Sequence, residues 1–214
     1  MMYFNVHLPN ESRALPVSLN LPGEHNVRNA LGAIAVAWEL GLDIEAITGS
    51  LAEFEGIGRR FAEVGCFDVG GRQVTVIEDY GHHPSELAVT ISAARNGWPG
   101  RRIVTVFQPH RFSRTNDLFD EFSQVLADSD VLVLTDIYAA GEKPIDGVDS
   151  GALCQSIRAR GRVNPVLISN VSDLPQELPS KLEEGDLVLL LGAGNIGHIA
   201  QEIREKGFSQ EVAA

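Results

Sequence analysis

Polar side chains follow four apolar runs of this sequence, and each set could bind an anion or move a proton. The four sets are Glu78–His83, Gln108–Thr115, Asp136–Glu142 and Gly192–Gly197. The second set holds Arg111, Arg114 and an imidazole, His110. Guanidinium groups bind carboxylate and phosphate oxygens in pairs, so this loop has the chemistry of an anion site. We therefore predict that Arg111 and Arg114 bind an anionic group.

The adjacent histidines His82 and His83 allow two interpretations. They precede Pro84, and proline is favoured at the first position of a helix, so they could simply begin one. They could equally belong to a site. A zinc site is the weaker hypothesis, because no HxxxH, HExxH or cysteine pattern accompanies them. We expect no metal ligands in this chain.

The fourth set, Gly192–Gly197, reads GAGNIG and matches the GxGxxG pattern of dinucleotide-binding folds. Only 17 residues follow Gly197. They leave no room for a second strand with an acidic residue about 20 residues further on. We favour glycines that permit close packing of a helix on a strand, and keep a nicotinamide-type oxidoreductase as an alternative.

Five apolar runs alternate with segments of helical period from Phe61 onward. The predicted strands are Val74–Ile77, Ile103–Phe107, Val131–Thr135, Val166–Ser169 and Leu187–Leu191, and the predicted helices lie near Pro84–Arg95, Asn116–Ala127, Gly151–Arg160, Pro179–Glu184 and Ile196–Lys206. A hairpin turning at Gly70-Gly71 precedes them. Such a pattern predicts a doubly wound, Rossmann-like α/β domain with a mostly parallel sheet. The polar sets then share the carboxyl edge of that sheet.

The first 55 residues lack the regular alternation of apolar runs and helical segments that follows Phe61. A strand over Pro16–Leu21 and helices over Asn26–Leu40 and Ile44–Phe54 are predicted, and Gly56-Ile57-Gly58 marks a domain boundary. Asn26 and Asn29 share a helical face, and their amides suit an adenine edge. Capping of the helix start explains Asn26 equally well.

The composition is that of a globular protein, with 44% hydrophobic and 21% charged residues. A net charge of -12 disfavours nucleic acid or an anionic membrane surface as a partner. Two cysteines provide no disulfide framework and suit a reducing cytosol. No apolar run reaches about 18 residues, and the first residues lack the pattern of a signal peptide. We expect a cytoplasmic protein.

Six stretches together resemble the Mur ligase family of peptidoglycan synthesis. They are PGEHNVRNALGAIAVAWELG, GRRF, EDYGHHPSELAVTISAARNGWPGRR, FQPHRFSRT, DIYAAGEKPIDGVDS and GAGNIG. The likeness begins near Pro16 and runs through the chain. EDYGHHP, FQPHRFSRT and DIYAAGE resemble most the members that join L-alanine to UDP-N-acetylmuramate.

The resemblance implies formation of an amide bond with ATP and Mg²⁺. The muramate carboxylate becomes an acyl phosphate, the amine of L-alanine attacks it, and phosphate leaves. By similarity, the residues that would contact ATP are His25, Asn26, Asn29, Arg60 and Asp79. The residues that would contact the substrates are Tyr80, His82, His110, Arg111 and Arg114. The candidate catalytic residues are Arg60, His82 and His110. Which arginine binds the alanine carboxylate stays open.

The chain departs from the family in one large respect. Mur ligases have a UDP-sugar domain, a central ATPase domain and a C-terminal domain, but this sequence contains no GxxxxGK[ST] phosphate loop. We therefore expect a C-terminal fragment. Residues 1–55 would be a helical remnant of the central ATP-binding domain, and residues 56–214 the C-terminal domain. Such a fragment would not turn over ATP alone. A non-catalytic binding module is the remaining alternative.

Overall fold

The computed structural model describes residues 1–9, 14–21, 23–54, 56 and 58–208. Its internal contacts divide the chain into two compact units, Met1–Ile57 and Gly58–Ala214. The division falls within the predicted boundary Gly56-Ile57-Gly58, of which Ile57 lies outside the described residues. The assignment of these units to a central and a C-terminal ligase domain stays a prediction.

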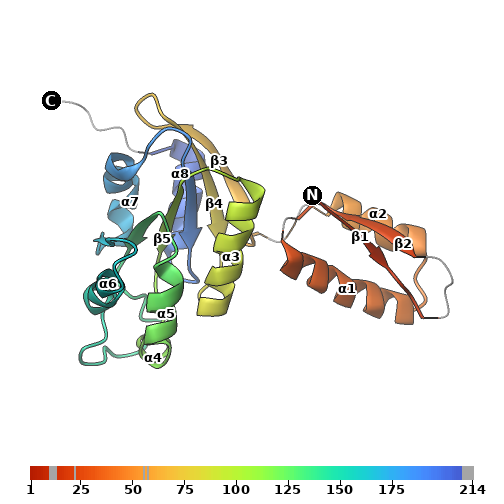
Figure 1. Ribbon diagram of the computed structural model, residues 1–214, viewed down its shortest axis with the longest axis horizontal. Helices are drawn as coiled ribbons and strands as arrows, with labels where there is room; N and C mark the ends of the chain where they lie inside the picture. The colour runs from red at the N-terminus through yellow and green to blue at the C-terminus, as the bar shows by residue number, and fades with distance from the viewer. Residues whose placement is uncertain (10–13, 22, 55, 57, 209–214) are drawn as a thin grey trace. The chain divides into compact units, whose positions relative to one another are not determined.

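The smaller unit combines a two-stranded sheet with two helices (Figure 1). Strand β1 (Met2–Val6) pairs antiparallel with β2 (Leu15–Leu19), and α1 (Glu24–Glu39) and α2 (Ile44–Glu53) follow. The strand predicted over Pro16–Leu21 is found as β2, whereas β1 was not predicted, so the description of this unit as a helical remnant was incomplete. Strand β1 escapes prediction because its five residues carry little periodicity, and its pairing with β2 is what defines it.

The two helices of the smaller unit begin differently. Asp43 caps α2, because its carboxylate accepts a hydrogen bond from the Ala46 N–H at 3.1 Å. Gly23 occupies the N-cap of α1, so the helix begins at Glu24, two residues before the predicted start. The capping explanation of Asn26 is therefore wrong, since this residue lies inside the first turn.

The larger unit holds a six-stranded sheet in the order β3-β4-β8-β5-β6-β7. Its strands are β3 (Ala62–Asp68), β4 (Gln73–Asp79), β5 (Ile103–Phe107), β6 (Val131–Leu134), β7 (Val166–Leu167) and β8 (Leu187–Leu191). Only the β3–β4 hairpin is antiparallel, and it turns at Gly70-Gly71 as predicted. The predicted α/β fold with a mostly parallel sheet is confirmed.

Helices cover both faces of this sheet (Figure 1). The α-helices are α3 (Pro84–Gly97), α4 (Phe112–Asp117), α5 (Phe119–Leu126), α6 (Ser150–Ala159), α7 (Leu174–Glu177) and α8 (Ile196–Lys206), and the 3-10 helices are η1 (Val171–Asp173) and η2 (Leu178–Lys181). The predicted helix over Asn116–Ala127 is in fact two, separated at Leu118. The predicted helix over Pro179–Glu184 is wrong. Pro175 and Pro179 are the second residues of the short turns α7 and η2, so the helical segment spans 171–181 and ends earlier.

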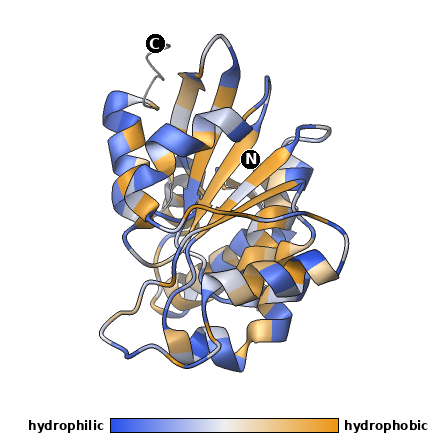
Figure 2. Ribbon diagram, turned by 90° about the vertical axis from the view of Figure 1, so that its left-hand side faces the viewer, coloured by the Kyte–Doolittle hydropathy of each residue, from blue (hydrophilic) through white to orange (hydrophobic). Residues whose placement is uncertain are grey.

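Alternate residues of the central strands pack on opposite faces, as the period of a strand requires. Leu187, Leu189 and Leu191 of β8 join the core formed with α3, α5 and α6. Val188 and Leu190 join the core formed with α7 and α8. Figure 2 shows these strands in the colour of hydrophobic residues. Burial on both faces explains why they appear in the sequence as continuous apolar runs.

No helix among the described residues is long and apolar enough to cross a membrane.

Candidate functional site

The strand register of the larger unit brings the polar sets to one edge. In the parallel pairs Asp79 lies opposite Leu191, and Leu191 lies opposite Phe107, which in turn lies opposite Leu134. The residues that follow each of these strands therefore emerge side by side. This is the edge at which open α/β sheets bind their ligands. We call it the carboxyl edge below.

Four aromatic rings form a continuous row at the carboxyl edge. The ring centroids of Tyr80 and His82 lie 5.3 Å apart, those of His82 and His110 5.7 Å, and those of His110 and Tyr138 5.4 Å. The last pair is stacked with an interplanar angle of 19°. The row joins three loops. Tyr80, His82 and His110 are predicted site residues, whereas Tyr138 is not among the residues predicted from the sequence.

His110 is held as a neutral imidazole. Burial, followed by the positive charge of Arg114, lowers its pKa below the ordinary value for histidine. Nη1 of Arg114 lies 3.3 Å from Nδ1 of His110. A guanidinium only donates, so Nδ1 is the acceptor and the imidazole proton lies on Nε2. A neutral His110 therefore adds no positive charge beside the two arginines.

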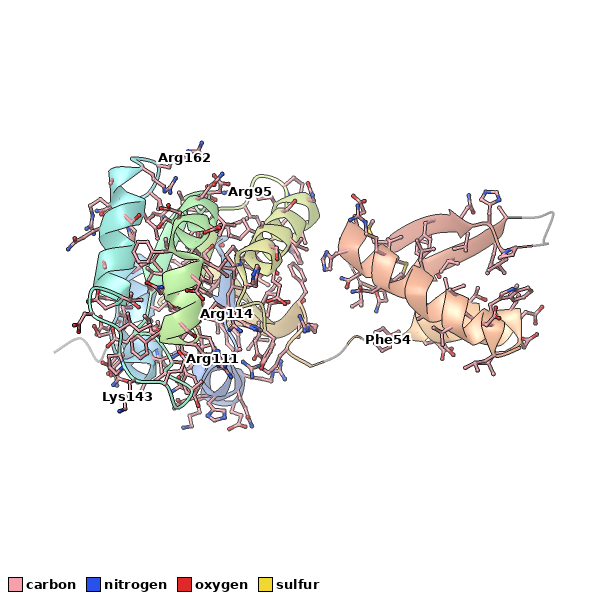
Figure 3. The ribbon with its side chains drawn as sticks, turned by 90° about the horizontal axis from the view of Figure 1, so that it is seen from below. Phe54, Arg95, Arg111, Arg114, Lys143 and Arg162 are labelled. Carbon is pink, nitrogen blue, oxygen red and sulfur yellow. The ribbon has the colours of Figure 1, made fainter. Side chains whose placement is uncertain are left out.

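Arg111 and Arg114 frame the same loop, and Figure 3 labels both on the side of the larger unit away from Arg95 and Arg162. Arg111 has a left-handed backbone, with φ of 74°, and its N–H donates to the Tyr138 carbonyl at 2.8 Å. Its side chain is 51% exposed, and its nearest recorded carboxylate, Glu142, is 4.0 Å away. The donors of Arg111 therefore remain available to an anion.

Asp79 ties two backbone segments together. Its carboxylate accepts hydrogen bonds from the Phe61 N–H at 2.8 Å and the Gly81 N–H at 2.7 Å. The residue is 7% exposed. Each carboxylate oxygen has a second lone pair, so these bonds still leave acceptor capacity for a hydroxyl group. The expected contact with a ribose stays a prediction.

The adjacent arginines Arg59 and Arg60 have different surroundings. The guanidinium of Arg59 pairs with Glu78 at 2.7 Å and donates to the Gly192 carbonyl at 2.9 Å, so its donors are largely used inside the protein. Arg60 is exposed, and its guanidinium carbon lies 5.7 Å from the centre of the Tyr80 ring. Two adjacent arginines look alike in the sequence, so nothing in it distinguished the internal Arg59 from the exposed Arg60. No role was predicted for Arg59.

The GAGNIG loop is packed rather than open. A Cβ on Gly194 would overlap the side chains of Gln108 and Tyr138, and one on Gly197 would lie 2.5 Å from the Arg59 guanidinium carbon. The Gln108 amide oxygen accepts from the Ile196 N–H at 3.0 Å, in the first turn of α8. These contacts favour the packing explanation over the dinucleotide-binding alternative. Gln108, 3% exposed, occupies the position that a phosphate would need.

His82 and His83 lie in different surroundings, and each of the two interpretations of the pair fits one of them. His83 caps α3 in a capping box, in which Ser85 N–H contacts its Nδ1 at 3.4 Å and Glu86 accepts from the His83 N–H at 3.1 Å. His82 lies in the aromatic row instead. The helix-start interpretation therefore holds for His83, and the site interpretation fits the placement of His82.

The remaining predicted residues lie in the smaller unit. His25, Asn26 and Asn29 all belong to the first part of α1; the first two are half-buried and Asn29 is exposed. Their expected contact with ATP stays a prediction. Within the described part of the chain, no group of three or more His, Cys, Asp and Glu side chains is placed to hold a metal ion.

The mostly parallel sheet with arginines at its carboxyl edge defines the class, a doubly wound α/β domain, and anion binding at that edge stays a prediction. Residues 59–194 match the family model described as Mur ligase, glutamate ligase domain. That match spans more than half of the chain, and the chain belongs to this family.

Curated relatives narrow the comparison. The UDP-N-acetylmuramate--L-alanine ligase of Xylella fastidiosa (strain M12) is 54% identical over 208 residues, which are 97% of this chain and 43% of the relative. That of Xanthomonas euvesicatoria pv. vesicatoria (strain 85-10) is 51% identical over 213 residues, 99% of this chain and 44% of the relative. The chain thus spans less than half the length of these relatives.

A solved structure agrees with the sequence comparison. The UDP-N-acetylmuramate-alanine ligase MurC of Thermotoga maritima is 29% identical, with a TM-score of 0.73 over 92% of this chain and 41% of that one. The murein peptide ligase of Psychrobacter arcticus, at 22% identity and a TM-score of 0.69, shares the fold. The resemblance to Mur ligases found in the sequence is confirmed.

Proposed function

We propose that this chain is the C-terminal part of an ATP-dependent ligase that joins L-alanine to UDP-N-acetylmuramate in the cytoplasm. The observation that carries the proposal is Arg111 at the carboxyl edge. Its guanidinium is half exposed, lacks a close ion pair among the described residues, and stands beside a neutral imidazole. Identity of 51–54% with ligases of this name supports the choice of substrates.

In the proposed reaction the muramate carboxylate attacks the γ-phosphorus of ATP, giving an acyl phosphate and ADP. The amine of L-alanine then attacks the acyl carbon, the amide forms as the C–O bond to phosphate breaks, and the amine loses a proton. Arg111 or Arg114 holds the alanine carboxylate, which places the amine for attack. His110 and His82 line the position of the proton that leaves.

Contacts with ATP are proposed residue by residue. In the smaller unit, Asn26 and Asn29 contact the adenine, with His25 beside them. In the larger unit, Arg60 faces the phosphates and Asp79 the ribose, while Tyr80 contacts the substrates. Mg²⁺ accompanies ATP and neutralises phosphate charge. No residue of this chain is assigned to it, because no described side-chain cluster fits a metal ion.

The test uses the whole enzyme that contains this chain. Phosphate release is measured with ATP, Mg²⁺, UDP-N-acetylmuramate and L-alanine, and then with each omitted. Replacing by alanine whichever of Arg111 and Arg114 holds the alanine carboxylate should lower kcat/KM for L-alanine by about 10- to 100-fold, the loss expected for hydrogen bonds to a charged group. Arg162→Ala, a surface variant labelled elsewhere in Figure 3, should leave it unchanged. Phosphate release independent of L-alanine would refute the proposal.

A further inference from the structure

A carboxylate from a distant loop caps the helix that carries the arginines. Glu142, in the loop after β6, accepts a hydrogen bond from the Ser113 N–H at 3.0 Å and another from the Ser113 hydroxyl at 2.7 Å. The two donors use different oxygens of the carboxylate. Glu142 is thus bound to the first turn of α4, 29 residues earlier in the chain.

Helix α4 cannot supply this cap itself. Its N-cap residue is Arg111, whose side chain can donate but not accept, so no backbone N–H of α4 is bonded to the N-cap side chain. A helix start needs an acceptor for its free N–H groups and favours negative charge. Glu142 provides both, so the loop after β6 stabilises the beginning of α4.

The same loop fixes the backbone of Arg111. The Arg111 N–H donates to the Tyr138 carbonyl at 2.8 Å, and its carbonyl accepts from the Thr115 N–H at 3.1 Å and hydroxyl at 2.8 Å. A φ of 74° is unfavourable for arginine and persists only where neighbouring groups over-determine it. Tyr138 thus binds the backbone of Arg111, and Glu142 binds Ser113 two residues further along the same turn.

The distance from Glu142 to the Arg111 guanidinium differs from that in the structural ion pairs of the unit. Oε1 of Glu142 lies 4.0 Å from Nη1 of Arg111, too far for a hydrogen bond but near enough to attract. By contrast, Arg102 binds the carboxylate of Asp186 with two nitrogens at 2.8 Å. Glu142 therefore stands near the Arg111 guanidinium without occupying its donors.

We propose that Glu142 is a positioning residue, which sets Arg111 in place for the carboxylate of the incoming amino acid. The inference rests on the proposed function and deepens it, because it selects Arg111 as the arginine whose placement is built into the fold. Glu142 itself touches no substrate in this account. It acts through Ser113 and Arg111.

The experiment measures steady-state kinetics of the whole enzyme for Glu142→Ala, Glu142→Gln and Ser113→Ala. Glu142→Ala should raise KM for L-alanine about tenfold, because Arg111 loses the support that holds it at the position of the alanine carboxylate. KM for ATP should stay within about twofold, because Glu142 acts through Ser113 and Arg111, and neither residue is assigned to ATP. Glu142→Gln keeps an acceptor without charge and should lie between wild type and Glu142→Ala. Ser113→Ala, which removes one of the two bonds, should have the smallest effect.

Glu121→Ala, at an exposed acidic position in the first turn of α5, is the matched control and should behave as wild type. If Glu142→Ala and Glu142→Gln lower only kcat or the melting temperature, with KM for L-alanine unchanged, the role is structural and the inference is overturned. A wild-type enzyme without L-alanine-dependent phosphate release would overturn the proposed function instead. The two failures are thus separate.

An NMR titration of this 214-residue chain tests the contact without reference to activity. Hydrogen bonds from Ser113, reinforced by the charge of Arg111, lower the pKa of the Glu142 carboxyl below its ordinary value. The Ser113 amide resonance should therefore shift with pH at a midpoint below that of an ordinary glutamate, and Glu142→Gln should abolish the shift. A Ser113 amide insensitive to pH would contradict the proposed contact.

Discussion

The two units of the chain differ in how completely they bury their apolar side chains. Among the described residues of the smaller unit seven apolar side chains are buried, and five of them form one cluster: Val6, Leu8, Val17, Ile34 and Ile47. The larger unit has two extensive cores, one on each face of its sheet. Of the large apolar residues exposed among the described residues, seven belong to the smaller unit: Met1, Tyr3, Leu31, Val36, Leu40, Leu42 and Phe54.

The exposed apolar side chains distinguish the unit that we expect to need further contacts from the unit that we expect to be stable by itself. Contiguous exposed apolar surface marks a face that contacts another part of a protein. Val36 of α1 and Leu40, which caps the end of that helix, are four residues apart and 63% and 73% exposed. The larger unit, by contrast, buries every residue of β5 and β8. It carries its own stability and presents the carboxyl edge on a rigid support.

The largest expected effect comes from separating the units. Residues 58–214 alone should give native circular dichroism and a cooperative unfolding transition, because both cores are retained. Residues 1–57 alone should be unfolded, since a chain of about 60 residues with so small a core is at the limit of independent stability. A cooperative transition in the isolated smaller unit would break the comparison.

Truncation of a core aromatic residue should show the same contrast inside the intact chain. Phe122 is fully buried and stacks on Phe107 with ring centroids 5.5 Å apart. Phe122→Ala should lower the free energy of unfolding of the larger unit by about 3–5 kcal/mol in a denaturant titration. Phe4→Ala, which alters a half-buried residue of the smaller unit, should cost clearly less. Equal losses would contradict the comparison.

A pair of glycines gives effects of opposite sign. Gly194→Ala forces a methyl group against Gln108 and Tyr138, and should destabilise the larger unit by about 1–3 kcal/mol. Gly32 lies inside α1 with open space around the position of a Cβ. Gly32→Ala should therefore stabilise the smaller unit by about 0.5–1 kcal/mol, the difference in helix propensity. Melting temperatures measure both changes, and a neutral Gly194→Ala would show that the loop is loosely packed.

The smallest effect concerns pH. The folded-state pKa of His110 is lowered, so the unfolded chain binds a proton more readily, and stability decreases as pH falls from the unfolded value of about 6.5 toward the folded one. Above that window the contribution of His110 is fully present. The melting temperature of the larger unit should thus decrease slightly between pH 7 and pH 5.5. His110→Gln should show a smaller decrease; an unchanged one would assign the dependence to other groups.

The sequence predicted the larger unit well because its signals are local. Runs such as Leu187–Leu191 are apolar throughout, and only a strand covered on both faces accounts for them. Parallel strands then bring their following loops to one edge, which is why His82, His110 and Arg111 could be grouped before any coordinates were known. The weak signals failed. Strand β1 and the helical turns over 171–181 depend on pairing and proline placement that no periodicity reveals.

The sequence by itself determined the sheet, the edge at which the polar loops meet and the family to which the chain belongs. The tertiary structure decided how neighbouring residues divide their tasks. It assigned Arg59 to an internal ion pair while Arg60 stays exposed, and made Gln108 the partner of the α8 start. It also placed the Glu142 carboxylate within hydrogen-bond distance of Ser113. These outcomes depend on contacts between residues far apart in the chain, and such contacts leave no local pattern to read.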